Sequence, residues 1–140
     1  MLKKRFLLSA IVLLCFLGIF YCSKDTTEVP ETAKSDPSFS NDIQPIFSSN
    51  CAVSGCHNST ASEGLILLEG QAYANIVNID SRQDQTKKLV LPVDSTNSYL
   101  VMKIEGRQTS GSRMPLNRSA LSDIKIQNIK NWINRGAKNN

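Results

Sequence analysis

Residues 39–57 read FSNDIQPIFSSNCAVSGCH, and this stretch carries the strongest folding signal in the chain. Its apolar side chains recur at i, i+4, i+7 and i+8, the spacing of one face of a helix: Phe39, Ile43, Ile46 and Phe47. Pro45 would lie in the first turn, where its missing N–H costs no hydrogen bond within the helix. The spacing therefore predicts a helix that starts near residue 39 and ends close to Cys51.

Two cysteines and a histidine follow this predicted helix directly: Cys51, Cys56 and His57. His57 is the only histidine among the 140 residues. The pattern is a longer form of the haem-attachment signature C-x-x-C-H, with four residues instead of two between the thiols. Ser54 and Gly55 favour a turn, so the additional residues can bulge outward while both thiols still reach the haem. The pattern predicts one covalently attached haem c per chain, with His57 as a ligand of its iron.

Two other chemistries are open to the same residues. In an oxidising compartment, Cys51 and Cys56 would form a disulfide. In a zinc site, Cys51, Cys56 and His57 would supply three ligands, and a carboxylate would have to supply the fourth. Residues 51–57 by themselves leave haem, disulfide and zinc as alternatives.

Residues 1–21 have the pattern of an export signal. The basic residues 3–5 precede an apolar run over residues 6–21, which is short for a membrane-spanning helix. Cys22 stands where this run gives way to polar residues, an arrangement that resembles a bacterial lipoprotein signal. We therefore expect export, lipidation of Cys22 and a location on the periplasmic side of a bacterial membrane. An uncleaved N-terminal anchor is the alternative, because residues 19–21 are Ile-Phe-Tyr where small residues usually precede such a cysteine.

The positive charge of the chain belongs mostly to this leader. The chain has 16 Lys and Arg against 12 Asp and Glu, and residues 3–5 account for three of the 16, which leaves 13 against 12. So small an excess does not suggest a nucleic-acid partner. Residues 22–38 have the polar composition of a flexible tether, and residues 39–140 are enough for one domain with one core.

Three further helices are expected after the cysteines, over residues 71–78, 98–105 and 122–136. Gly106 would stop the second, while Ser122 would cap the start of the third and Gly136 would end it. The third carries an apolar stripe at helical spacing: Ile124, Ile129, Trp132 and Ile133. The pattern predicts an all-α fold of about four short helices joined by long loops.

Several segments together resemble the cytochrome c-like domain of exported bacterial proteins, a small class I c-type cytochrome. They are IQPIF at 43–47, the cysteine loop at 51–57, GL at 64–65, LPVD at 91–94, SYL at 98–100, MP at 114–115 and WINRGA at 132–137. The resemblance covers residues 39–137 and implies a cytochrome c-like fold around one haem. It also implies that His57 and Met114 are the two iron ligands.

The residues themselves favour Met114 as well. A single histidine cannot supply two imidazole ligands, and beyond Met1 only Met102 and Met114 carry a thioether. Met102 lies within a predicted helix, where a methionine more often fills the core. Met114 follows a flexible Ser-Gly-Ser segment and precedes Pro115, an arrangement suited to bringing a sulfur to a fixed iron. The alternative is that Met114 only packs.

These features predict a monohaem electron carrier in the cell envelope rather than an enzyme. Its expected partners are an unknown redox protein of the envelope and, through the N-terminal anchor, a membrane. If Met114 did not bind iron, the open position would favour a haem sensor or a peroxidase-like protein. If no haem were attached, a cofactor-free interaction domain with a Cys51–Cys56 disulfide would remain.

Overall fold

The computed structural model describes residues 31–60 and 64–140. The expected signal peptide, Cys22 and residues 22–30 of the expected tether lie outside the described residues. The described part of the chain contains no helix with the length and apolar character needed to cross a membrane.

The described residues form four α-helices and one π-helical turn, connected by long loops. The π-helical turn η1 (Phe39–Ile43) leads directly into α1 (Gln44–Asn50), and α2 (Ala72–Ile76), α3 (Tyr99–Glu105) and α4 (Asp123–Asn134) follow. In place of strands, the described loops contain two isolated β-bridges, Val77 with Val90 and Asp80 with Lys88. The prediction of an all-α chain with about four short helices is confirmed for these residues.

Three of the helical elements begin or end where local chemistry favours it: η1, α3 and α4. Ser38 caps η1, because its side chain accepts a hydrogen bond from Asn41 N, and Ser122 caps α4 in the same way through Lys125 N. Gly106 ends α3 in the left-handed conformation, with a φ of 78° that a residue with a Cβ rarely adopts. The predicted helices therefore differ from the observed ones mainly at their ends.

An aromatic cluster joins the first and last helical segments, η1 and α4. The ring of Phe39 in η1 lies 5.3 Å from the ring of Trp132 in α4 and 5.3 Å from that of Tyr73 in α2, measured between centroids. Trp132 also donates its indole N–H to Lys138 O at 2.8 Å. Because Phe39 and Trp132 are almost fully buried, the first and last helical segments share one core.

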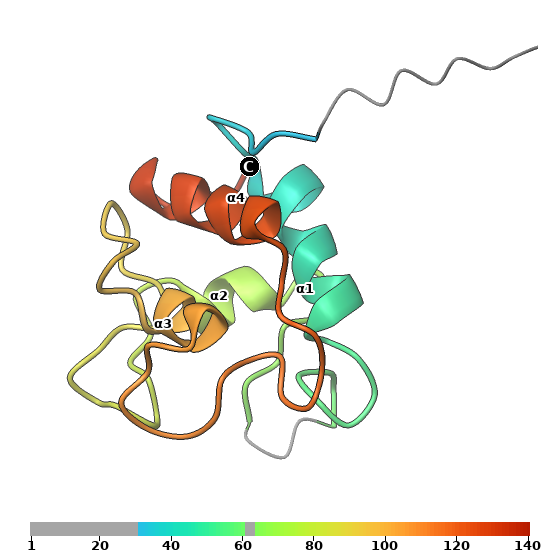
Figure 1. Cartoon of the computed structure of the whole chain (residues 1–140), viewed down its shortest axis with the longest axis vertical. Coiled ribbons are helices and arrows are strands. Elements are labelled where there is room, and N and C mark those ends of the chain that lie inside the picture. Colours follow the sequence, from blue (N-terminus) through green and yellow to red (C-terminus); the bar gives the residue numbers. More distant parts are fainter. Residues whose placement is uncertain (1–30, 61–63) are drawn as a thin grey trace, which may run out of the picture.

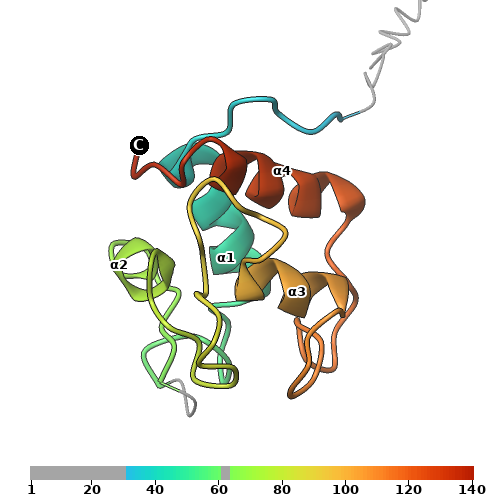
Figure 2. The same cartoon turned by 90° about the vertical axis from the view of Figure 1, so that its left-hand side faces the viewer.

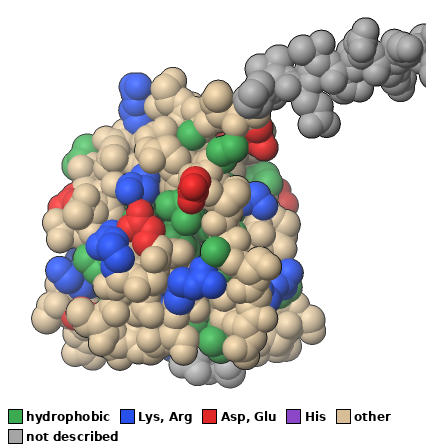
Figure 3. Space-filling model, viewed as in Figure 1, with side chains coloured by type: hydrophobic (Ala, Val, Ile, Leu, Met, Phe, Trp, Pro, Cys, Tyr) green, Lys and Arg blue, Asp and Glu red, His purple; other side chains and the backbone are tan. Residues whose placement is uncertain are grey.

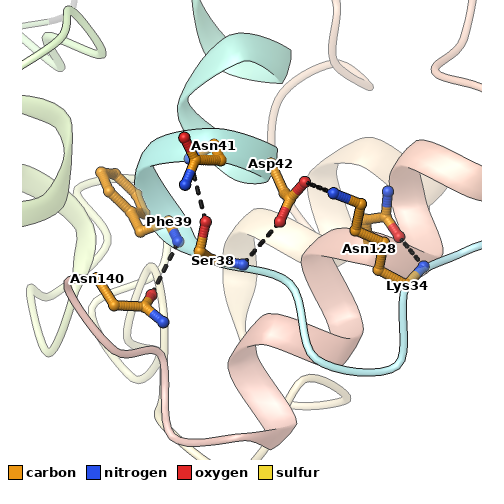
Figure 4. A network of polar contacts seen from close by, with 7 residues as sticks. All are labelled: Lys34, Ser38, Phe39, Asn41, Asp42, Asn128 and Asn140. Carbon is orange, nitrogen blue, oxygen red and sulfur yellow. Dashed lines mark hydrogen bonds and ion pairs between the residues drawn. The ribbon is translucent and has the colours of Figure 1, made fainter.

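Residues 34–38 form a short strap that polar contacts hold against η1 and α4 (Figure 4). Lys34 N donates to Asn128 Oδ1 at 2.7 Å, and the side chain of Asn131 donates to Lys34 O at 2.6 Å. At the other end of the strap, Ser38 N donates to Asp42 Oδ2 at 2.8 Å. Residues 34–38, the last part of the expected tether, are therefore held against the domain.

α4 and the site-bearing loops lie at opposite ends of the molecule (Figures 1 and 2). In Figures 1 and 2, α4 and residues 31–38 lie at one end, while the loops 51–60 and 106–117 lie at the other. The face of the molecule in Figure 3 carries basic and acidic side chains interspersed with small groups of apolar ones. The two loops that carry the cysteines, His57 and Met114 thus lie at the same end of the domain.

Candidate functional site

The four residues predicted to bind haem line one cavity of about 400 Å³. Cys51 directly follows α1, and Cys56 and His57 follow in the next loop. Met114 reaches the same cavity from the loop between α3 and α4. The fold therefore brings two distant parts of the sequence to one site, with a volume in the range of small-molecule and cofactor pockets, about 300–1,000 Å³.

Backbone hydrogen bonds within residues 51–57 hold the loop that carries the two cysteines in a compact turn. At its start, Cys51 N donates to Phe47 O at 2.8 Å and so ends α1. Cys56 N then donates to Val53 O at 3.0 Å, and His57 N donates back to Cys51 O at 3.0 Å. Gly55 provides the left-handed turn, with a φ of 75°. The backbone hydrogen bond from His57 N to Cys51 O therefore holds the ends of the loop together, and Ser54 and Gly55 are exposed at its tip.

A backbone carbonyl fixes the orientation of the His57 ring. Nδ1 of His57 lies 3.0 Å from Leu65 O, and His57 O accepts a hydrogen bond from Leu67 N at 2.8 Å. Because a carbonyl oxygen only accepts hydrogen bonds, Nδ1 must carry the proton, and Nε2 keeps its lone pair. Metal-binding histidines are commonly held in this way by a hydrogen bond from the second ring nitrogen.

Met114 is placed by α3. Its backbone N donates to Lys103 O at 2.9 Å, which fixes the loop against the C-terminal half of that helix. Met114 lines the cavity, whereas Met102, on α3 itself, is absent from the cavity wall. The structure therefore distinguishes the two methionines that the sequence offered as ligands.

The rest of the wall is largely apolar. Its apolar members are Leu65, Leu67, Ala74, Ile79, Leu89, Leu100, Ile104, Pro115 and Leu116. Ile79 and Leu116 are 43% and 48% exposed, so they stand at the rim of the cavity rather than at its base. The cavity can therefore hold a largely apolar group, part of which would lie near solvent at this rim.

Electrostatics disfavour a nucleophilic role for the first thiol. Burial and, to a lesser extent, the neighbouring Cys56 raise the pKa of Cys51 to about 11, and the charge of Arg118 partly opposes them. At neutral pH this thiol is protonated, which removes the thiolate that nucleophilic cysteines require. Both Cys51 and Cys56 are free thiols in the structure.

A zinc site finds no support in the described residues. Residues 31–60 and 64–140 contain no group of three or more His, Cys, Asp and Glu side chains placed to hold a metal ion. Cys51, Cys56 and His57 therefore share a cavity without forming a compact ligand set around one point, as a structural zinc would require.

Sequence reasoning missed the charged side chains of the wall. Arg82, Lys103 and Arg118 line the cavity, together with the neutral side chains of Gln83 and Tyr99. Lys103 is buried, and burial lowers its pKa. A signal for Lys103 was present, because it lies four residues after Tyr99 and therefore on the buried face of the same helix.

Comparison of the chain with protein-family models, curated proteins and solved structures finds no match in any of the three. The function of the chain is therefore inferred from its site.

Proposed function

We propose that this chain is a monohaem c-type cytochrome that carries single electrons in the cell envelope. The observation that supports this most strongly is the composition of one cavity wall, which combines Cys51, Cys56, His57 and Met114 in an apolar setting. Two thiols, one imidazole and one thioether are the groups that would attach a haem and bind its iron.

The donor set of the cavity fits a haem. Cys51 and Cys56 would hold it through thioether bonds to its two vinyl groups, and His57 Nε2 and Met114 Sδ would bind the iron. His57 suits this role because Leu65 O already engages Nδ1. When bound, the haem iron supplies a one-electron couple, and methionine ligation favours its reduced form.

The protein would hold the haem in place, keep water away from it and leave one edge of it accessible to a partner. His57 and Met114 would both bind the iron, which would leave it no open position for a substrate. The apolar wall excludes water from the site, and the exposed rim at Ile79 and Leu116 leaves an edge that a redox partner can approach. These properties favour electron transfer between proteins over bond chemistry.

The location in the envelope rests on the N-terminal residues. The basic and apolar pattern of residues 1–21 supports export, and Cys22 supports a lipid anchor at a bacterial membrane. Export would also bring Cys51 and Cys56 to the compartment in which haem attachment or disulfide formation takes place. An unidentified redox protein of the same compartment is the proposed partner.

An absorption spectrum tests the proposal. The full chain would be exported in a host with cytochrome c maturation, purified, and measured oxidised and dithionite-reduced, before and after extraction with acidified acetone. Sharp reduced bands that survive extraction are expected, because thioether bonds retain the haem. A colourless protein from its native host, two hydrogens lighter than the reduced chain, would instead establish the disulfide-bonded interaction domain.

A further inference from the structure

Lys103 is the one charged side chain that the fold buries among the described residues. It is 7% exposed and lines the same cavity as His57 and Met114. A lysine is rarely buried without a partner of opposite charge, because removing an ammonium group from water is costly. Its position therefore calls for an explanation.

The side chains and carbonyls around the Lys103 ammonium are neutral. Nζ donates to Gln83 Oε1 at 2.8 Å and to Ser110 O at 3.4 Å, and it lies 5.8 Å from the centre of the Tyr99 ring. An ammonium group has three N–H donors, and these contacts occupy two of them. One donor and the whole positive charge remain for a ligand.

The charges of the wall are unbalanced. Lys103 and Arg118 contribute two positive charges to the described part of the wall. Among the described residues of the wall, Asp80 is the only carboxylate, and its Oδ1 lies 2.7 Å from Nζ of Lys88, outside the cavity. The cavity therefore combines an apolar body with an excess of positive charge, which suits an apolar ligand that carries carboxylates.

The loop after α3 fits closely over Lys103 and Gln83. Gly111 has a φ of 70°, and a Cβ at this position would lie 2.8 Å from Gln83 Oε1 and 3.0 Å from Lys103 Nζ. Glycine therefore allows the backbone to approach the two side chains and hold them in place. The ammonium is pre-positioned rather than free to turn into solvent.

We propose that Lys103, supported by Gln83, pairs with a propionate carboxylate of the haem and thereby fixes which way round the haem lies in the cavity. This inference rests on the proposed function. A haem carries two propionates, and a positive charge beside one of them offsets its negative charge next to the iron. The paired charge also favours the reduced iron, since the reduced state carries one positive charge fewer.

The test uses the haem-loaded full chain and four forms of it: the natural sequence, Lys103→Met, Lys103→Arg and Lys138→Met. Lys138 is exposed, and its replacement removes the same charge at a residue outside the described cavity wall. Covalent haem per chain and the midpoint potential are measured for each form. In the reduced natural protein, nuclear Overhauser contacts identify the side chains next to the propionate methylene protons.

The expected result is that Lys103→Met keeps its covalent haem and has a lower midpoint potential. Lys103→Arg should restore the natural value, and Lys138→Met should leave it unchanged. The Overhauser contacts should connect a propionate to Lys103 and Gln83, and this measurement needs no variant to fold. A potential that Lys103→Met does not change, or propionates placed against other side chains, would overturn the inference while the cytochrome proposal stands. A colourless natural protein would overturn both.

Discussion

The Nδ1 atom of His57 lies 3.0 Å from the carbonyl oxygen of Leu65. This contact fixes the tautomer of the only histidine in the chain, and it comes from a residue eight positions further on. We expect the Nδ1–H proton to be visible by NMR in the reduced haem-loaded protein and to exchange slowly with solvent. Fast exchange, or a proton on Nε2, would contradict the orientation of the ring and with it the ligand role of Nε2.

Met114→Ala should open the iron to external ligands. Without the thioether, the sulfur-to-iron absorption band of the oxidised protein should vanish, and carbon monoxide should bind the reduced protein. Met102→Ala is the matched control, because Met102 does not line the cavity. If Met114→Ala keeps the band, another sulfur binds the iron and the assignment of Met114 is wrong. If the natural protein already binds carbon monoxide, the open-site haem sensor or peroxidase-like protein becomes the better hypothesis.

Asp42 should make the domain more stable at neutral pH than in acid. Burial raises the pKa of Asp42, but hydrogen bonds from Lys34 and Ser38 and the charge of Lys34 outweigh this and hold the pKa below its ordinary value of 3.8. A carboxyl group with a lowered pKa stabilises the folded state above pH 3.8 and loses this contribution as the pH falls through the folded pKa.

Urea unfolding of Asp42→Asn across pH 2 to 7 tests this expectation. The variant should be less stable than the natural protein at pH 7, and the difference should shrink below about pH 4. The exposed Asp36 supplies the control, since Asp36→Asn should follow the natural curve. An equal loss of stability at every pH would show that Asp42 acts through packing rather than through its charge.

Val93→Gly should stabilise the domain. Val93 has a φ of 63° and is 72% exposed, so a β-branched residue occupies the left-handed region without burying its side chain. Relief of about 1–2 kcal/mol of left-handed strain, less roughly 0.5–1 kcal/mol for the added chain entropy of glycine, predicts a gain of up to about 1.5 kcal/mol. Chemical denaturation measures this gain, and Val93→Ala, which keeps a Cβ, should recover less of it. A destabilised glycine variant would mean that the Val93 side chain makes an unrecognised contribution.

Trp132→Ala should cost about 3–5 kcal/mol of unfolding free energy, the usual range for a buried aromatic side chain. Trp132 is 1% exposed, contacts Phe39 and donates to Lys138 O, so its loss would separate α4 from η1. Trp132→Phe keeps an aromatic ring without the N–H donor and should lose less. Equal losses for the two variants in urea unfolding would assign the whole effect to the hydrogen bond.

The sequence by itself determined where the helices lie and which donor groups, two thiols and an imidazole, the loop after α1 carries. Periodicity located the apolar faces at Phe39 to Phe47 and at Ile124 to Ile133, and Ser122 and Gly106 marked helix ends, because caps and stops depend on local backbone chemistry. The spacing of Cys51, Cys56 and His57 was also local. These signals lie within a few residues of the structure that they predict.

Only the tertiary structure decided what surrounds that loop. The contact of Leu65 O with His57, the choice between Met102 and Met114, and the buried charge of Lys103 depend on how loops and helices from separate parts of the chain pack. Periodicity shows which face of a helix is buried, but it does not show which other segments cover that face. For this reason the sequence named the groups that would hold a haem, whereas packing alone placed them on one wall and added a positive charge beside them.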